Sequence, residues 1–252
     1  MAGVLHNALE VYWDNTLTPS RENEFPLAPH DEVMAGRVDA VRYKRQNRRL
    51  ALKSWKVMVP ELLGLSESAG FSEGPSRVQI CGWGLGRDLE WIPKIVNAGF
   101  QVSVCDVSSV ACTTCQIFLD RRGVGNVQVI TSDLEQAWNN GSIHDEQVLV
   151  YYAGQFVQNQ SEEEKDTAME HFGSFLRIPT QNGLGRRVYL LHARGEDNPP
   201  DKVRWRNTIP YSDLELRAPL EKGFGGPVLM EVIARHRYYH QCYSFLRIGG
   251  AP

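Results

Sequence analysis

Three closely spaced glycines and a carboxylate are the residues of this chain whose types and spacing best suit chemistry. Gly82, Gly84 and Gly86 follow a short apolar run, and Asp106 ends the next apolar run after a segment of helical character. Glycines allow a sharp backbone turn and let a ligand approach main-chain N–H groups that a Cβ atom would shield. A carboxylate that ends a strand can accept hydrogen bonds from both hydroxyls of a ribose. Open α/β folds bind adenosine-containing cofactors with elements in this order, so the sequence predicts such a site over residues 77–106.

The spacing of the glycines separates two kinds of adenosine site. A dinucleotide fingerprint, G-x-G-x-x-G, needs a third glycine at position 87, and this chain has Arg87 there. Its third glycine comes one residue earlier, and the resulting G-x-G-x-G resembles motif I of the class I S-adenosylmethionine-dependent methyltransferases. Glycine triplets also occur in ordinary tight turns between a strand and a helix, so the resemblance depends on the later segments of the chain as well.

The segments after Asp106 continue the resemblance in order and spacing. A third apolar strand ends on Asp133, and further strands are predicted over residues 147–153 and 187–193. A polar helix is predicted between these two strands, with Ser161 as its N-cap and acidic residues in its first turn. As a set these features are specific, although each piece alone is weak.

The C-terminal third completes the predicted architecture. A helix over residues 212–221 has the capping-box pair Ser212 and Glu215, and two long strands follow over residues 228–236 and 241–248. Families of this class end in such a hairpin, with the last strand antiparallel beside strand five. The resemblance therefore implies an α/β fold with a doubly wound, seven-stranded, mostly parallel sheet.

The residues before the glycine loop differ from the rest in composition. Residues 1–65 have helical patterns, and a polar linker over residues 66–76 separates them from the first strand. Small-molecule methyltransferases often cover the cofactor cleft with N-terminal helices. We therefore expect a helical cap or lid over residues 1–65 and a cofactor-binding domain over residues 77–252. Tyr12 and Trp13 could wall an apolar substrate there, or could simply dock the first helix on the core.

The resemblance implies S-adenosylmethionine as cofactor and S-adenosylhomocysteine as product. It assigns the glycines to the methionine end and ribose, Asp106 to the ribose hydroxyls and Asp133 to the adenine. The residues that it implies for cofactor binding are Gly82, Gly84, Gly86, Asp106, Val107, Asp133, Leu134, Tyr152 and Ala153. One position departs from the family pattern, because Ile80 stands where an acid usually orients the amino-acid end of the cofactor. Either another group takes that role or methyl transfer is impaired.

Three side chains are candidates for the reaction itself. A sulfonium methyl group is already activated, so the enzyme aligns a nucleophile and excludes water, and O- or N-methylation often adds a general base. His192, at the carboxyl end of the predicted fifth strand, is the first candidate, and Tyr152 is the second, as an acceptor-orienting hydroxyl. His30, in the predicted cap, is the third. For each, the alternative is an ordinary polar residue at the rim of the sheet.

Composition and cysteine usage favour a cytoplasmic protein without a metal site. The chain has 252 residues, 42% of them hydrophobic, and a formal net charge of −3, which are ordinary values for a globular protein. No apolar run approaches the roughly 20 residues that span a bilayer, and the N-terminus lacks the pattern of a secretory signal. Cys112 and Cys115 form a lone C-x-x-C without further ligands at metal spacing, so we interpret them as small buried helix residues. Cys81 and Cys105 are expected in buried strands.

The sequence thus predicts a methyltransferase that modifies an oxygen or nitrogen atom of a small molecule, with specialised metabolism as one setting. Two alternatives stay open. A basic run over residues 37–56 could dock RNA or protein substrates, although the acidic overall balance and the missing interleaved aromatic residues argue against nucleic acid. A protein of this fold could also have lost methyl transfer and serve a binding or rearrangement role, which the isoleucine at position 80 favours.

Overall fold

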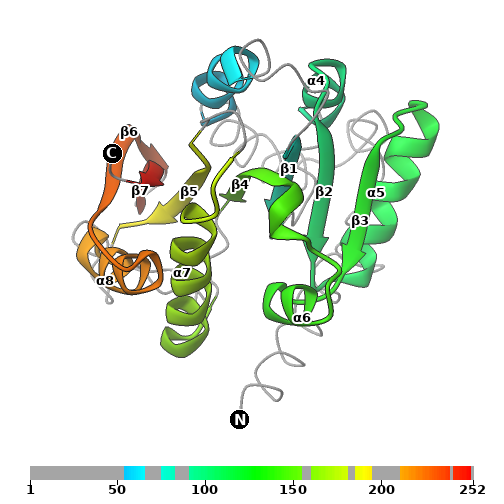
Figure 1. Cartoon of the computed structure of the whole chain (residues 1–252). Helices are drawn as coiled ribbons and strands as arrows, with labels where there is room; N and C mark the ends of the chain where they lie inside the picture. The colour runs from blue at the N-terminus through cyan, green and yellow to red at the C-terminus, as the bar shows by residue number, and fades with distance from the viewer. Residues whose placement is uncertain are drawn as a thin grey trace.

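Seven strands form one sheet in the computed structural model of the chain, in the order β3-β2-β1-β4-β5-β7-β6 (Figure 1). The strands are β1 (Arg77–Cys81), β2 (Gln101–Asp106), β3 (Val127–Thr131), β4 (Val148–Gly154), β5 (Arg187–Ala193), β6 (Val228–Tyr238) and β7 (Gln241–Gly250). The structure describes residues 54–65, 75–82, 91–154, 160–180, 185–194, 211–238 and 241–250. Strands β1 to β5 pair in parallel, and β7 is antiparallel to both β5 and β6. The predicted doubly wound, seven-stranded, mostly parallel sheet is confirmed.

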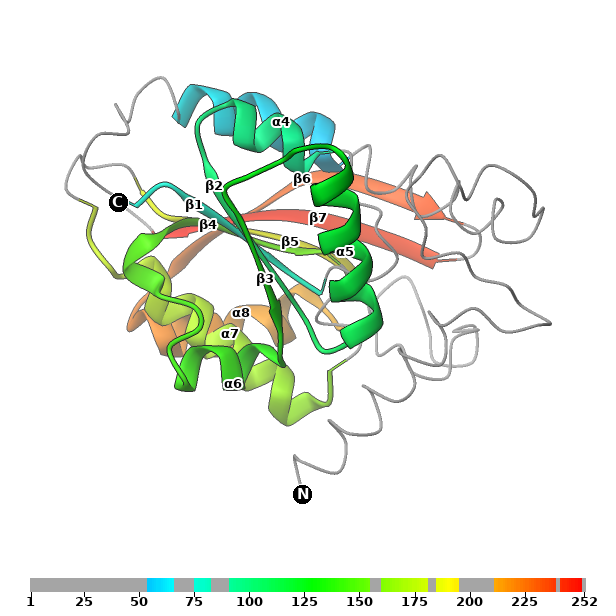
Figure 2. The same cartoon turned by 90° about the vertical axis from the view of Figure 1, so that its right-hand side faces the viewer.

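Helices cover both faces of this sheet. They are α4 (Ile92–Asn97), α5 (Ser109–Arg121), α6 (Leu134–Asn139), α7 (Glu162–Leu176) and α8 (Asp213–Phe224), with a short 3-10 turn η1 (Asp145–Gln147) before β4. Residues 54–65 are also helical. Figure 2 shows this helix and α4 on one side of the sheet and α6, α7 and α8 on the other. The buried side chains of α5 belong to the same apolar cluster as those of α4, so two helix layers enclose the sheet.

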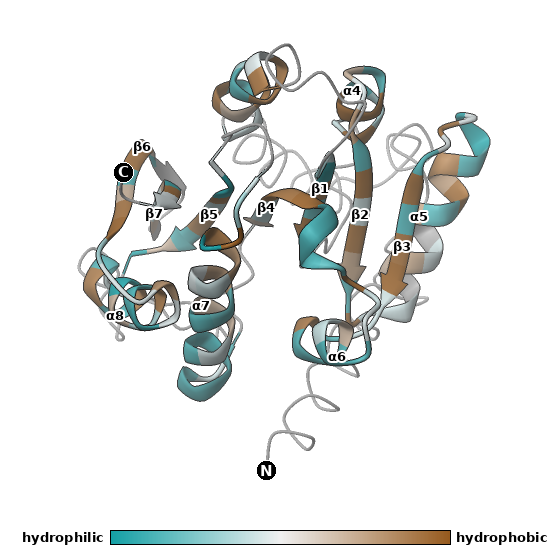
Figure 3. Cartoon of the chain, in the orientation of Figure 1, coloured by the Kyte–Doolittle hydropathy of each residue, from teal (hydrophilic) through white to brown (hydrophobic). Residues whose placement is uncertain are grey.

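The burial of each strand follows from its place between these layers. All residues of β4 are buried, and β5 is buried after its first residue, because helices cover both of their faces. Strands buried on both faces are continuous apolar runs rather than alternating ones, which is why both segments could be identified in the sequence. The edge strand β3 is only partly buried. Figure 3 shows that β2 and β3 are mostly hydrophobic, whereas much of α7 is hydrophilic.

Serine caps begin three of the helices. The side chain of Ser108 accepts a hydrogen bond from the N–H of Ala111 at 3.1 Å. Ser161 and Ser212 form full capping boxes with the glutamates three residues later, as predicted for the second of them. Local hydrogen bonds therefore fix where α5, α7 and α8 begin, at the edge where the preceding strands end. The six-residue helix α6 was not predicted, because its sequence is too short to show a clear period.

The helix over residues 54–65 packs directly on the sheet. Trp55 is 0% exposed, and its ring stacks on that of Trp91 with a centroid distance of 5.9 Å. Near the other end of the helix, Glu61 accepts hydrogen bonds from Tyr189 of β5 and from Arg247 of β7, the latter at 2.8 Å. The described end of the predicted cap is therefore part of the main core. The division into a cap over residues 1–65 and a cofactor domain stays a prediction, because residues 1–53 lie outside the described residues.

Two glycines allow α7 and α8 to cross closely. A Cβ atom on Gly223 would lie under 3.0 Å from the carbonyl oxygen of Glu170, and one on Gly173 would lie equally close to that of Leu220. We expect Gly223→Ala to lower the free energy of unfolding, measured by urea denaturation, by about 1–3 kcal/mol. The new methyl group would force the backbones of α7 and α8 apart. Gly64→Ala is the matched helical control, since its new Cβ atom would meet nothing within 4 Å. An equal loss in both variants would contradict the close crossing.

Candidate functional site

The order of the strands creates one place where neighbouring connections leave on opposite faces. Strands β1 and β4 are neighbours, and the chain passes from β1 to α4 on one face but from β4 to α7 on the other. In open α/β sheets, ligands bind at such a switch point, outside the carboxyl ends of the strands. We call the carboxyl ends of β1, β2, β3, β4 and β5, with the residues directly after them, the carboxyl edge.

The glycine turn begins at this edge. Gly82 follows β1 with a φ angle of 65°, a left-handed conformation that favours glycine, and its N–H donates to the carbonyl oxygen of Cys105 at 3.0 Å. Gly84, Gly86 and Arg87 lie outside the described residues. Ile80 is fully buried in the apolar cluster that contains Trp55. The position that carries an acid in the family pattern therefore contributes only packing here.

Asp106 ends β2 beside this turn, as the sequence predicts. Its side chain is 8% exposed, and Oδ1 accepts a hydrogen bond from the N–H of Ser108 at 2.9 Å. Its carbonyl oxygen accepts from the N–H of Ser132 at 3.0 Å, which ties the ends of β2 and β3 together. The bond to Ser108 sets the direction of the carboxylate, and a carboxylate has room for further donors such as ribose hydroxyls. Val107 comes next in the chain and is half-buried.

Asp133 lies two residues beyond the end of β3 and caps α6. Its Oδ1 accepts a hydrogen bond from the N–H of Gln136 at 2.6 Å, and the next residue, Leu134, is buried against the sheet. An N-cap aspartate contributes roughly 1 kcal/mol of helix stability. The carboxylate thus has a structural role that the sequence did not predict, at the position where a contact to adenine is expected.

Tyr152 and Ala153 lie near the carboxyl end of β4. Tyr152 pairs with Ile80 of β1 and with Tyr189 of β5, and its ring contacts Trp55 at a centroid distance of 4.8 Å. A Cβ atom on Gly154 would lie 2.8 Å from the hydroxyl oxygen of Tyr152, so that hydroxyl reaches the end of the strand. Both residues are buried next to the switch point.

The three reaction candidates fall in different places. Tyr152 lies on the face of the sheet covered by the helix over residues 54–65, whereas His192 of β5 faces α8 and is 1% exposed. The structure therefore does not bring these two side chains together on one face. His30 lies outside the described residues.

The cysteines near the site are buried thiols. All five are free, and Cys81, Cys105, Cys112 and Cys115 are buried, as predicted. Burial, followed by the neighbouring Cys112 and Asp106, raises the pKa of Cys115 to about 12. Burial also raises the pKa of Cys81 and of Cys105, so these two thiols and Cys115 keep their protons at neutral pH and are poor nucleophiles. Within the described ranges, no group of three or more histidine, cysteine, aspartate or glutamate side chains could hold a metal ion.

Another cluster of titratable groups lies beside the amino end of β4. The hydroxyl of Tyr151 donates to Oδ1 of Asp145 at 2.6 Å, and Oδ2 of Asp145 lies 2.8 Å from Nε2 of His171. Trp138 donates to the same hydroxyl at 3.1 Å and stacks on His171. Burial and the charge of Asp145 raise the pKa of Tyr151, so it stays protonated. The members face one another, and we interpret the cluster as a network that holds α6 and α7 on the sheet.

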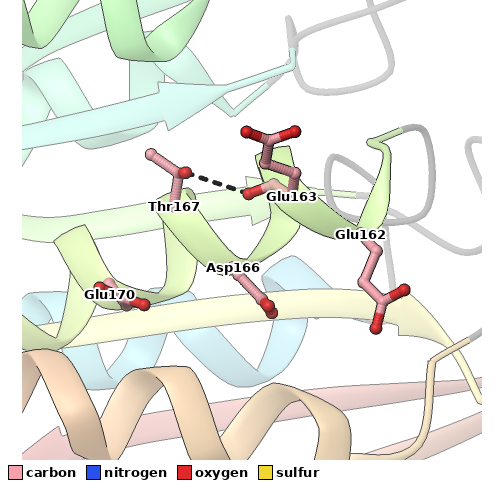
Figure 4. Close-up of a pocket in the computed structure, with 5 residues that line it drawn as sticks. All are labelled: Glu162, Glu163, Asp166, Thr167 and Glu170. Atoms are coloured by element: carbon pink, nitrogen blue, oxygen red, sulfur yellow. Dashed lines mark hydrogen bonds between the residues drawn. The ribbon is translucent and has the colours of Figure 1, made fainter. Parts of the chain in front are cut away.

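An acidic hollow of about 580 Å³ runs along α7 (Figure 4). Its lining residues are Glu162, Glu163, Asp166, Thr167 and Glu170, all from this one helix. Figure 4 shows these side chains projecting from successive turns of α7, where the hydroxyl of Thr167 donates to the carbonyl oxygen of Glu163. Because no strand end contributes to it, the hollow is separate from the switch point and does not match the predicted cofactor site.

Sequence patterns missed two residues that contact the candidates. Asp213 lies 3.2 Å from the ring of His192, and Trp55 packs on Tyr152. Local pattern could have suggested Asp213 only as an acid in a first helical turn and Trp55 only as an apolar helix position. Asp213 is more than 20 residues from His192 along the chain, and Trp55 is nearly 100 residues from Tyr152. Both contacts therefore depend on the tertiary structure.

No protein-family model and no curated protein matches this chain. Among solved structures it is similar to the magnesium protoporphyrin IX methyltransferase of Synechocystis PCC 6803 with bound SAH, at 15% identity over 98% of this chain and 100% of that chain, with a TM-score of 0.60. It is similar to the bifunctional kinase-methyltransferase WbdD, with a TM-score of 0.53 and 10% identity, over 77% of this chain and 39% of that one. It is also similar to the [4+2]-cyclase SpnF, with a TM-score of 0.51 and 14% identity, over 76% of this chain and 81% of that one.

These similarities show that the chain has the class I methyltransferase fold, as the sequence predicts. The fold itself accommodates more than one reaction, since one of the similar structures is described as a cyclase. Within the described residues, no helix is both long enough and apolar enough to cross a bilayer.

Proposed function

We propose that this protein is an S-adenosylmethionine-dependent methyltransferase that acts on a small molecule. The observation that carries the proposal is Asp106 at the end of β2, beside the left-handed Gly82 that follows β1 at the switch point of a class I methyltransferase fold. The similar magnesium protoporphyrin IX methyltransferase structure contains SAH, the product form of this cofactor. A cytoplasmic location belongs to the same proposal.

The residues at the carboxyl edge suit the nucleoside half of the cofactor. Asp106, held by Ser108, would accept the ribose hydroxyls, and Gly82 keeps the first residue of the turn free of a side chain. Leu134 is buried beside Asp133 and would lie against the adenine ring, whose amino group would donate to Asp133. When bound, the cofactor supplies a methyl group on a positively charged sulfur, so the protein needs only to orient an acceptor and exclude water.

The acceptor is proposed to be an oxygen or nitrogen atom. We keep Tyr152 for orienting it, because the hydroxyl lies at the end of β4 next to the backbone of Gly154. Burial beneath the helix over residues 54–65 fixes the ring against Trp55, so the hydroxyl has little freedom. His30 remains a further candidate on sequence grounds.

A second function is favoured by one observation. Position 80 is an isoleucine, which has no carboxylate to orient the amino-acid end of the cofactor, and its side chain is fully buried among apolar side chains. The similar structure of SpnF is described as a [4+2]-cyclase. The alternative is a protein of this fold that has lost methyl transfer and binds a partner or catalyses a rearrangement.

Cofactor binding and label transfer together test the proposal. We expect calorimetry to detect binding of S-adenosylhomocysteine by the full chain, and methyl-labelled S-adenosylmethionine to pass its label to a small molecule in a metabolite extract. Binding without transfer in any extract would favour the alternative. Label in RNA or protein, with steeply salt-dependent docking, would favour a macromolecular substrate. Absence of binding would overturn the proposal.

A further inference from the structure

A buried histidine of β5 meets a partly buried aspartate in the first turn of α8. Nε2 of His192 is 3.2 Å from Oδ1 of Asp213, and Nδ1 of the same ring is 3.1 Å from the carbonyl oxygen of Ala193. Both ring nitrogens therefore face oxygen acceptors. A general base needs a nitrogen lone pair directed at the substrate, and neither nitrogen of this enclosed ring has that direction.

A buried lysine also contacts the first turn of α8. Lys165 of α7 is 3% exposed, and its Nζ donates to the carbonyl oxygen of Glu215 at 3.3 Å while lying 4.6 Å above the ring of Tyr211. The same Nζ pairs with Asp166 at 2.8 Å. The hydroxyl of Tyr211 donates to the carbonyl oxygen of Gln160 at 3.0 Å, directly before α7. The first turn of α8 is thus tied both to β5 and to the start of α7.

The charges around Asp213 favour its ionised form. The polar contact with His192, 3.2 Å away, is the main cause that holds the pKa of Asp213 below its ordinary value, and it outweighs burial, which acts in the opposite direction. The cations Arg194, after β5, and Arg235, of β6, act in the same direction as His192. From β7 the facing residue is Ser244, the buried cross-strand neighbour of His192, which carries no charge. The N-terminus of a helix also stabilises a negative charge.

We propose that His192 is a positioning residue, which with Asp213 fixes the start of α8 at the carboxyl edge, and that it is not the general base of the reaction. As a statement about catalysis this rests on the proposed function. The coupling between the two side chains does not, because it can be measured on the protein without cofactor or substrate.

The coupling is tested by carbon-13 NMR of the Asp213 carboxyl group in the full chain. His192→Gln keeps a side-chain donor but cannot become charged, so the titration of Asp213 should move upward toward the ordinary aspartate value of about 3.9. Leu214→Ala, at an exposed position of the same helical turn, is the matched control and should leave that titration unchanged. An unchanged titration in His192→Gln would overturn the pairing.

The stability of the protein should report the same pair. Because the folded-state pKa of Asp213 is lowered, its contribution is present above the unfolded value near about 3.9 and is lost as the pH falls through the lower folded value. The difference in melting temperature between wild type and His192→Gln should therefore be larger at pH 6 than in acid, where Asp213 is neutral in both and only the change in packing remains. A difference that stays constant into acid would contradict the pairing.

Kinetics separate positioning from base catalysis. If His192 were the base, His192→Gln would lose about 100-fold or more in kcat and the acidic limb of the pH profile. We expect instead a loss of less than about 10-fold, an unchanged pH profile, and the same loss in Asp213→Asn. Loss of the acidic limb of the pH profile in His192→Gln, but not in Asp213→Asn, would overturn the positioning role. If wild type transfers no methyl group, the proposed function fails while the NMR result still decides the pairing.

Discussion

Asp106→Ala should weaken binding of S-adenosylhomocysteine by about 100-fold or more in calorimetry. Hydrogen bonds to a charged group contribute roughly 1.5–3 kcal/mol each, and the proposed site has Asp106 accept two of them from the ribose. Losing both corresponds to at least about 3 kcal/mol, which is more than a 100-fold change in affinity. The carboxylate is nearly buried, so water would not easily replace the lost contacts.

Two further variants make this result interpretable. Asp106→Asn keeps an oxygen acceptor for the N–H of Ser108, so it should preserve the local turn while removing the charge. Asp120→Asn is the matched control, because Asp120 is an exposed acid of α5 whose side chain accepts a hydrogen bond from Gln116. Circular dichroism would check the fold of each. Wild-type affinity in a folded Asp106→Ala protein would sink the proposed cofactor site.

Trp55→Ala should lower the free energy of unfolding by about 3–5 kcal/mol, the usual range for removing a large aromatic side chain from a core. The ring is fully buried, stacks on Trp91 and contacts Tyr152, so its removal leaves a void between the helix over residues 54–65 and the sheet. Urea denaturation followed by far-UV circular dichroism measures the change.

Lys56→Ala is the control for this experiment, since Lys56 is the exposed neighbour of Trp55 on the same helix. Substitutions at such surface positions usually change stability by less than about 0.5 kcal/mol. A small effect of Trp55→Ala, comparable to that of the control, would mean that this helix is not part of the cooperative core. Weaker cofactor binding in Trp55→Ala would in addition connect the helix to the carboxyl edge through Tyr152.

The elements of the fold could be predicted because their signals are local. The strand β5 was predicted with the bounds that the structure has, Arg187–Ala193, since a strand buried on both faces is a mostly continuous apolar run. The capping boxes at the start of α7 and α8 each join two residues three positions apart in the sequence. Ser161 and Ser212 could therefore both be identified as N-caps. The family resemblance implied a doubly wound, seven-stranded sheet with the last strand antiparallel beside strand five, and the sheet confirms both features.

Local sequence patterns predicted only part of the candidate site. The end of β2 at Asp106 was predicted from one acid after an apolar run, but its hydrogen bond to Ser108 depends on the turn between that strand and α5. Asp133 was assigned to the adenine from its position after β3. Its role as the N-cap of α6 could be recognised only from the backbone of the folded chain. A short helix has too few residues to show periodicity, and its cap is then ambiguous.

By itself, then, the sequence determined the strands and most of the helices, because backbone preference and burial depend on residues close together along the chain. The tertiary structure alone decided that His192 meets Asp213 instead of facing Tyr152, and that Lys165 holds the start of α8. Those contacts join residues that the crossover helices bring together from distant segments. Side-chain direction alternates along each strand, so neighbouring strand ends can deliver their polar groups to opposite faces of one sheet.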